Sequence, residues 1–494
     1  MFKIVEGNPK GLSDVDWFVQ LLANPPNPSR QFFETDQDIF VTRAPGRLDV
    51  MGGIADYSGS LVLEMPIAEA TFAAIQKNSS RTIEIVSINH DGQRCSTFEV
   101  NLADLMLDAK PLDLASAGNY FAERTGGNWA SYVGGVFFVL AKERAIQFET
   151  GAKIVVATRV PIGKGVSSSA ALEVSAMQAV CIAYGIEVAP RDLALLCQIV
   201  ENYVVGAACG VMDQVASHCG ESGRLTSLVC QPAEIRGSIK IPENVEFWGI
   251  DSGVRHAVSD SGYSSVRIGA FIGYRIIAEL EGLHVREVGE GMVEIDDEHW
   301  RGYLANVSPE QYEKKFRHDL PNAMSGREFL SRYRGITDTV TSIDPSKTYA
   351  IRAPVEHAIY ENWRVNRFAD LMTGLPHDDR LVEAGRLMFR SHESYEKCGL
   401  TESRTDRIVE LVRSSKGKGL FGARITGGGS GGTVAVLARR GNRKAIDWLT
   451  DRVRQQAGAK PYVFHGSSPG CSLFGHLRLR HDLDETEHTT KVAE

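Results

Sequence analysis

The sequence has no CxxC pair, no surplus of basic residues and no visible internal repeat. Its eight cysteines are scattered through apolar or helical-looking stretches, which predicts reduced structural thiols and no metal-ligand spacing. The 54 lysine and arginine residues stand against 62 acidic residues, a formal charge of −8, and this balance argues against nucleic acid as a partner. A local positive pocket for a small anion is still compatible with that charge.

Long uncharged apolar runs are also missing. The first residues, MFKIVEGNPKGLSDVDWF, show no basic segment followed by an apolar one, so we expect no secretory signal and a cytoplasmic location. The most apolar stretch, residues 170–189, contains Glu173 and Glu187. It therefore predicts a buried core helix and no membrane span.

The composition is that of a packed globular protein. The 494 residues, 43% of them hydrophobic and 23% charged, are enough for two or three domains. Residues 39–51, 71–78, 81–89 and 152–160 predict strands, and residues 129–144 and 191–205 predict helices. We divide the chain into an N-terminal extension (1–38), an N-terminal domain (39–240), a C-terminal domain (241–480) with a polar, partly helical insertion near 284–350, and a flexible tail (481–494).

A glycine- and serine-rich segment, PIGKGVSSSA at residues 161–170, lies between a predicted strand and the apolar helix. Glycines let backbone N–H groups approach a ligand closely, and the start of the helix attracts an anion. The segment fits a phosphate cradle whose serines could also ligate Mg²⁺. A serine-rich helix cap after a flexible turn fits it equally. The GxxxxGK[ST] and GxGxxG patterns are absent.

Two further glycine-rich segments flank polar residues. RAPGRLDVMGGIADY at residues 43–57 holds an arginine and carboxylates that could orient a polyhydroxylated ligand, or it is a hairpin with surface charges. RITGGGSGGTV at residues 424–434 could wrap a substrate or nucleotide, or serve as a linker. The strand-like residues on both sides favour an ordered turn.

Taken in order, these segments resemble the motifs of the GHMP small-molecule kinases, and the galactokinase branch most. The matching stretches are APGR at 44–47, WASYVGGV at 129–136, GVSSSAALEV at 165–174, GVMDQ at 210–214, SHESYEKCGLTES at 391–403 and GGGSGG at 427–432. The resemblance implies an α+β fold of two domains, the first like domain 2 of ribosomal protein S5 and the second ferredoxin-like. It also implies an active site in the cleft between them, with ATP and Mg²⁺ as cofactors.

The resemblance assigns roles to individual residues. Asp213 falls on the family's catalytic carboxylate and Arg47 on its arginine, whereas composition alone would make Asp213 an ordinary charge in the first turn of a helix. Ser169 and Glu201 fall on the Mg²⁺ ligands, whereas composition alone would make Glu201 a solvated face residue. The implied nucleotide-binding residues are Gly163, Lys164, Gly165, Val166, Ser167, Ser168, Ser169 and Ala170.

One departure from the family bears on the sugar. Galactokinases usually read GEHTDY where this chain reads GGIADY, so Gly53 and Ile54 replace a polar pair that lies around the exocyclic C6 hydroxyl. Asp56, which holds ring hydroxyls in the family, is retained. The apolar corner suits L-arabinose, which has galactose's hydroxyl arrangement at carbons 2 to 4 and no CH₂OH group. The other implied sugar-binding residues are Tyr263, Gly428 and Gly429.

The resemblance thus predicts ATP-dependent phosphorylation of the anomeric hydroxyl of L-arabinose. Two alternatives stay open. One is a galactokinase or another sugar kinase that tolerates the changed pocket, and the other is a regulator that binds a sugar without turnover. The oligomeric state and the residues that contact adenine are not predicted.

Overall fold

The structure is a computed structural model that describes residues 2–26, 32–89, 95–107, 110–124, 126–255, 261–415, 417–457 and 460–481. Apart from its first residue, the predicted tail lies outside the described residues. Across these ranges no helix combines the length and the apolar composition that crossing a membrane requires.

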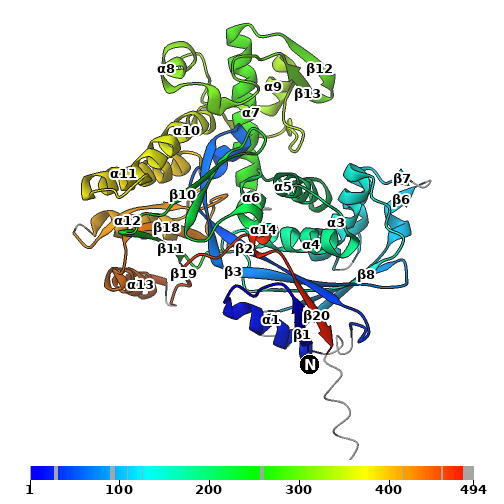
Figure 1. The fold of residues 1–494 in the computed structure, drawn as a ribbon. Coiled ribbons are helices and arrows are strands. Elements are labelled where there is room, and N and C mark those ends of the chain that lie inside the picture. Colours follow the sequence, from blue (N-terminus) through cyan, green and yellow to red (C-terminus); the bar gives the residue numbers. More distant parts are fainter. Residues whose placement is uncertain are drawn as a thin grey trace, which may run out of the picture.

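A mixed sheet, nine-stranded within the described ranges, forms the centre of the fold (Figure 1). Its main path runs through β1 (Phe2–Glu6), β20 (Leu477–His481), β2 (Ile39–Met51), β3 (Leu61–Lys77), β8 (Ala152–Thr158), β4 (Thr82–Ile88) and β5 (Cys95–Asn101). β9 (Arg224–Val229) pairs with the first half of β3, and β10 (Glu234–Lys240) pairs with β9. The three glycine-rich segments are numbered in chain order, so that the first is residues 43–57, the second 161–170 and the third 424–434. The first segment occupies most of β2 and continues into the connection to β3. Strands from both ends of the chain, β1 and β20, join the same sheet.

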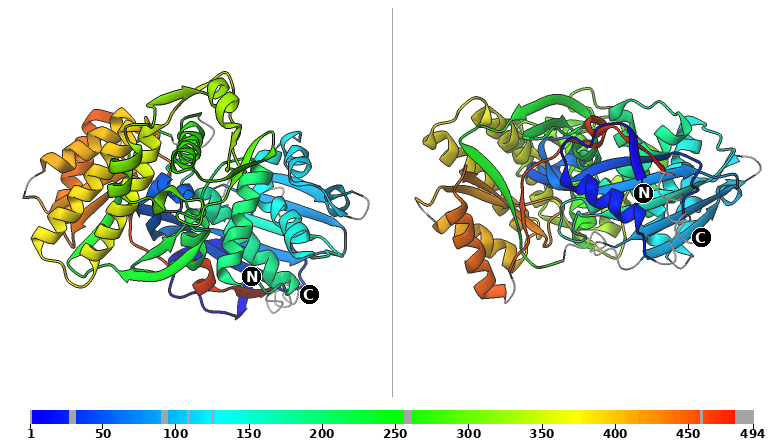
Figure 2. Two further views of the ribbon diagram at one scale, coloured as in Figure 1. Left: turned by 90° about the horizontal axis from the view of Figure 1, so that it is seen from above. Right: turned by 60° about the horizontal axis from the view of Figure 1, so that its bottom comes forward.

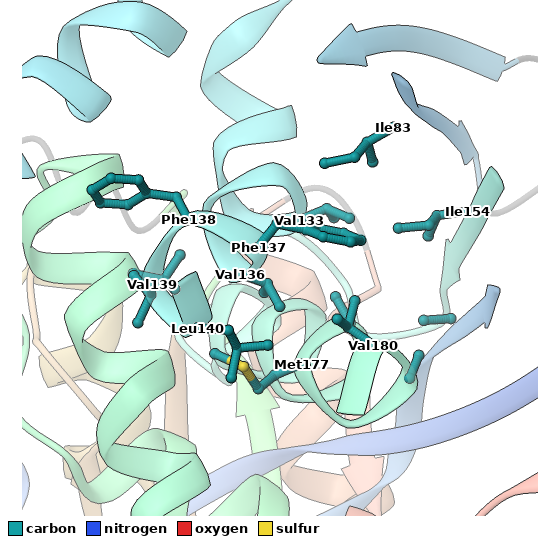
Figure 3. Packing of buried hydrophobic residues seen from close by; sticks show 14 of the residues in the cluster. Ile83, Val133, Val136, Phe137, Phe138, Val139, Leu140, Ile154, Met177 and Val180 are labelled. Atoms are coloured by element: carbon teal, nitrogen blue, oxygen red, sulfur yellow. The ribbon is translucent and has the colours of Figure 1, made fainter. Parts of the chain in front are cut away.

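Helices cover both faces of this sheet. α3 (Gly127–Arg144) and α4 (Ser168–Tyr184) pack on one face, and α1 (Ser13–Ala23) packs on the other (Figure 1). Figure 3 shows Ile83 and Ile154 of the sheet near Phe137 of α3, with Met177 of α4 in the same cluster. β2 and β3 are buried along almost their whole length, as expected for central strands of a sheet that is covered on both faces. The predicted core helix is confirmed as α4, which ends at Gly185 in the left-handed conformation.

A second sheet holds the third glycine-rich segment. Its order is β17 (Leu420–Ile425), β18 (Thr433–Arg439), β11 (Val245–Asp251) and β19 (Val463–His465). The glycines form the turn between β17 and β18, so the predicted strand–loop–strand pattern is confirmed. α12 (Ser403–Ser414) and α13 (Arg443–Ala457) pack against this sheet, and α10 (Arg352–Met372) and α11 (Asp378–Lys397) lie in the core between the two sheets. Figure 2 shows these four helices gathered at one end of the molecule.

The polar segment 284–350 packs against α7 (Ser261–Glu281) and α10. It holds short strands as well as helices: β12 (Val285–Gly289), β13 (Gly291–Ile295), β14 (Ala323–Ser325), α9 (Gly326–Tyr333), β15 (Gly335–Ile336) and β16 (Thr348–Ala350). Strands of two to five residues are too short to show a periodic pattern, which is why the sequence indicated a partly helical insertion and no strands here. The domain boundaries stay a prediction.

Several shorter elements complete the description. They are the 3₁₀ turns η1 (Gly53–Ser58), η2 (Leu102–Leu105) and η4 (Leu304–Asn306), the π-helical turns η3 (Val200–Val205) and η5 (Tyr312–Phe316), the helices α2 (Leu114–Ala122), α5 (Pro190–Ile199), α6 (Met212–Cys219), α8 (Pro309–Gln311) and α14 (Cys471–Phe474), and the strands β6 (Met106–Leu107) and β7 (Lys110–Pro111). η1, η3 and α6 carry candidate functional residues.

Candidate active site

A cavity of about 1310 Å³ collects residues from all three glycine-rich segments. Arg47 and Asp56 come from the first segment, Ser168 from the second and Gly428 from the third, and Asp213 lines the same space. These residues are widely separated in the sequence. The fold therefore brings the three segments to one site.

Arg47 and Asp213 are in direct contact. Arg47 Nε donates to Asp213 Oδ1 at 2.8 Å, and Arg47 Nη1 donates to the carbonyl of Gly165 at 2.8 Å. The neighbouring Gly46 makes this approach possible, because a Cβ there would lie 2.6 Å from the carbonyl oxygen of Val166. The backbone N–H of Arg47 donates to that same oxygen at 3.1 Å. The first and second segments are thus joined backbone to backbone.

Arg47 stands between carboxyl groups. Its side chain is 3% exposed, and an oxygen of the fully buried Glu64 lies 3.4 Å from its Nε. Although burial opposes its charge, Asp213 and Glu64 together raise the pKa of Arg47. Arg47 therefore stays cationic beside the carboxylate that faces the cavity.

The start of α4 faces the cavity. Ser167, the residue before the helix, has φ 57°, a left-handed conformation that is uncommon for serine, and its hydroxyl donates to Asp213. Ser168 and Ser169 in the first turn line the cavity. The first N–H groups of a helix have no partner within it and attract anions. Strain at Ser167 and the position of α4 both fit an anion site.

Glu201 on η3 lies beside Ser169. Burial and repulsion from Asp213 raise the pKa of Glu201 to about 7, while hydrogen bonds from Ser169, Cys209 and Gln214 lower it. Gln214 Nε2 donates to Glu201 Oε2 at 2.7 Å and to the buried Glu173 at 3.3 Å. A hydroxyl and a carboxylate in a crowded acidic cavity form an oxygen donor set that suits Mg²⁺.

Asp56 on η1 forms another part of the wall. Its Oδ1 accepts the N–H of Tyr57 at 2.6 Å, and a Cβ at Gly210 would lie 1.7 Å from its Oδ2, so Asp56 packs directly on that glycine. Burial, with repulsion from Asp213, raises the pKa of Asp56 to about 7, and Arg267 opposes this shift. The site thus holds a carboxyl group whose charge is poised near neutral pH.

Arg267 is itself fixed by the polar segment. It forms a buried pair with Asp338, with Nη2 2.8 Å from Oδ1, and it lies over the ring of Tyr57. Tyr263, one turn earlier on α7, lines the cavity and meets Tyr57 edge to face. The polar segment therefore reaches the sugar-binding candidates through Asp338.

Five of the predicted site residues lie outside the cavity wall. Val166 and Ala170 are buried in the core, and Lys164 forms an ion pair with Asp251 beside a smaller cavity of about 270 Å³. A Cβ at Gly429 would lie 2.4 Å from the carbonyl oxygen of Leu400, and one at Gly53 would lie 1.7 Å from Tyr395 Oη. These two glycines allow close packing behind the site.

The structure reveals partners that the sequence did not indicate. Asp49 and Arg424, both fully buried, form an ion pair with Nη1 2.9 Å from Oδ2. The carboxylate of Asp49 also accepts the N–H of Gly53 and of Gly427. Asp49 therefore ties the first segment to the third.

Other lining residues come from outside the three glycine-rich segments. From the polar segment these are Val340, Thr341, Ser342, Asp344, Lys347 and Tyr349, and from the start of α3 they are Asn128, Trp129 and Tyr132. The stretch WASYVGGV at residues 129–136, which matches the family, contains Trp129 and Tyr132, whereas no local signal marks the lining residues of the polar segment.

Comparison with known families agrees with this geometry. The model of the GHMP kinases N terminal domain matches residues 131–221, and the model of the GHMP kinases C terminal region matches residues 372–447. The chain belongs to the GHMP kinase family. The galactokinase galactose-binding signature matches residues 30–77, which contain Arg47 and Asp56 of this GHMP kinase.

Curated relatives fall in the sugar-kinase part of the family. This GHMP kinase is 41% identical to L-arabinokinase of Arabidopsis thaliana over 97% of its own chain and 52% of the relative. It therefore spans about half the length of that relative. It is 27% identical to galactokinase of Chloroflexus aggregans, covering 80% of this chain and 83% of the relative.

Solved structures show the same fold. The crystal structure of Lactococcus lactis galactokinase complexed with galactose matches with a TM-score of 0.64 at 18% identity, over 92% of this chain and 97% of that one. Mevalonate kinase of Methanococcus jannaschii matches with a TM-score of 0.52 at 16% identity, over 86% and 97%. The predicted GHMP kinase fold is confirmed.

Proposed function

We propose that this GHMP kinase transfers the γ-phosphoryl group of ATP to the anomeric hydroxyl of L-arabinose, giving L-arabinose 1-phosphate and ADP. The contact between Arg47 and Asp213 at the mouth of α4 carries the proposal. It sets a carboxylate and a cation beside an anion site in one cavity. The identity of 41% to an L-arabinokinase supports the choice of sugar.

The chemistry follows from these positions. Asp213 accepts the proton of the anomeric hydroxyl, whose oxygen forms a bond to the γ-phosphorus while the bond from that phosphorus to the ADP oxygen breaks. Arg47 neutralises charge on the transferred group. The first turn of α4 and the glycines before it hold the phosphate oxygens.

Ser169 and Glu201 are the proposed ligands of Mg²⁺. When bound with the nucleotide, the ion would offset the negative charge of the phosphates. The hydrogen bond between Ser169 and Glu201 and the repulsion between the carboxyl groups of Glu201 and Asp213 support a cation at this place. The remaining ligands would come from the nucleotide and water.

Asp56 and Ile54 are the proposed determinants of the sugar. Asp56 would accept hydrogen bonds from ring hydroxyls, and the apolar side chain of Ile54, which lines the cavity, would leave an exocyclic hydroxyl without a partner. Tyr263 and Gly428 complete this wall. We also propose a cytoplasmic location, in keeping with the buried free thiols of Cys181, Cys197 and Cys471.

A galactokinase is the second candidate, favoured by the galactose-binding signature at residues 30–77. ADP release in the presence of L-arabinose, D-galactose or D-glucuronate separates the two. We expect the highest kcat/KM with L-arabinose, and a clear preference for D-galactose would refute the pentose assignment.

Asp213→Ala tests the catalytic assignment in the same assay. We expect kcat to fall by about 10²–10⁴-fold, the usual contribution of a positioned acid–base group. Unchanged turnover would contradict the role of Asp213. If the unaltered protein binds a sugar and turns over none, it is a sensor and not a kinase.

A further inference from the structure

Tyr395 on α11 connects two of the glycine-rich segments behind the cavity. Its side chain is fully buried, its hydroxyl accepts the backbone N–H of Ile54 at 2.8 Å, and the same hydroxyl donates to the carbonyl of Gly427 at 2.8 Å. Both bonds are near the ideal length for their type. The phenol therefore fixes the backbone of Ile54 against the third segment.

This hydroxyl occupies the space beside Gly53. A Cβ at Gly53 would lie 1.7 Å from Tyr395 Oη and 2.8 Å from Arg424 Nη2. Gly53 also has φ 50°, in the left-handed region. Tyr395 thus excludes from position 53 any side chain of the kind that galactokinases carry there.

Ile54 is the residue through which Tyr395 reaches the cavity. Its side chain packs in one buried cluster with Tyr395, Val266 and Leu400, and it also lines the cavity wall. The ring of Tyr395 backs the isoleucine and its hydroxyl holds the isoleucine backbone. Together, the packing of the ring and the hydrogen bond to the backbone hold the side chain of Ile54 at the cavity wall.

We propose that Tyr395 is a positioning residue for sugar specificity, which keeps Ile54 pressed into the cavity and so disfavours sugars that carry an exocyclic hydroxymethyl group. The inference rests on the proposed sugar kinase function. A sugar whose exocyclic hydroxyl faces the apolar side chain of Ile54 binds less well, because that hydroxyl finds no hydrogen-bond partner and the group takes up additional space. Tyr395 touches neither nucleotide nor sugar in this scheme and acts through Ile54.

The test is the ratio of kcat/KM for L-arabinose to kcat/KM for D-galactose, measured on one preparation of each variant. Tyr395→Phe keeps the ring and removes both hydrogen bonds, and Tyr395→Leu removes the ring as well. We expect the ratio to fall about tenfold in Tyr395→Phe, in line with the loss of buried hydrogen bonds, and further in Tyr395→Leu. The change should come mainly from the two KM values.

The ratio separates specificity from folding, because a preparation with less active protein loses both activities equally. Tyr312→Phe is the matched control: Tyr312 is also fully buried, its hydroxyl bonds Glu356, and it packs in a different cluster. This variant should keep the ratio of the unaltered protein. A ratio within twofold of that value in both Tyr395 variants would overturn the inference.

Two further outcomes remain decisive. If neither Tyr395 variant is soluble, Ile54→Ala, which leaves Tyr395 in place, must lower the ratio, and an unchanged ratio would overturn the inference. If the unaltered protein phosphorylates neither sugar, the proposed function fails first. Turnover of L-arabinose with an unaffected ratio would instead reject Tyr395 alone.

Discussion

Asp49→Asn is expected to destabilise the protein strongly. Asn keeps the size of the side chain, but its single oxygen can replace only one of the two carboxylate oxygens that accept the N–H groups of Gly53 and Gly427, and it cannot neutralise Arg424. Arg424 is fully buried, and its Nε and Nη2 have no hydrogen-bond partner among the described residues. Glu361 also interacts electrostatically with Arg424, but it is already paired with Arg364 at 2.6 Å.

The size of the effect follows from this burial. Removing one partner of a buried ion pair leaves an uncompensated charge and costs about 3–5 kcal/mol. The exposed pair of Arg443 and Asp447, 3.0 Å apart with side chains 63% and 56% exposed, provides the control. Asp447→Asn should cost less than about 0.5 kcal/mol.

Urea unfolding followed by tryptophan fluorescence and circular dichroism measures both values, and coincident curves would justify a two-state treatment. The double variant Asp49→Asn with Arg424→Met removes the stranded charge and should regain at least half of the loss. If Asp49→Asn lies within about 1 kcal/mol of the unaltered protein, the buried pair is not the anchor described here.

Three further predictions concern the cavity. The fold raises the pKa of Asp56 from 3.8 to about 7, so its carboxyl contributes stability below pH 4 that is lost as the pH rises to 7. Asp56→Asn should therefore raise the free energy of unfolding at pH 8 by up to about 4 kcal/mol and change it little at pH 4. Equal effects in urea titrations at the two pH values would contradict this. Glu201→Gln should raise the Mg²⁺ concentration for half-maximal ADP release by about tenfold or more, and an unmoved midpoint would argue against Glu201 as a ligand. Asp338→Ala leaves Arg267 without its buried partner and should raise the KM for the sugar more than it lowers kcat. Steady-state kinetics at saturating ATP measure both constants, and an unchanged KM would contradict a link between Asp338 and the sugar site.

Local chemistry explains what the sequence could predict. The triple serine before an apolar run indicated an anion site at a helix start, and α4 begins at Ser168. Glycines in tight turns indicated where backbones approach one another. Motif order then placed Arg47 and Asp213 together, and the fold brings their side chains to 2.8 Å.

Long-range contacts explain what the sequence could not predict. Asp49 looks like any acid near a turn, and Arg424 looks like a charge on an edge strand, until the fold buries them together. Tyr395 has the spacing of a helix core residue, and only its neighbour Gly53 shows why a hydroxyl is needed there. The wall formed by residues 340–349 comes from a segment whose strands are too short to leave a pattern.

The cavity wall draws on residues from Arg47 to Gly428, contributed by β2, by the turn between β17 and β18, by several helices and by the polar segment. A ligand that binds there contacts stretches of chain that are far apart in the sequence, and the unfolded chain offers it no comparable site. Ligand binding should therefore raise the free energy of unfolding by about 2.7 kcal/mol at a ligand concentration one hundred times Kd, and raise the melting temperature accordingly. Candidate sugars and nucleotides can thus be ranked by heating the protein with each of them, even for compounds that it never converts.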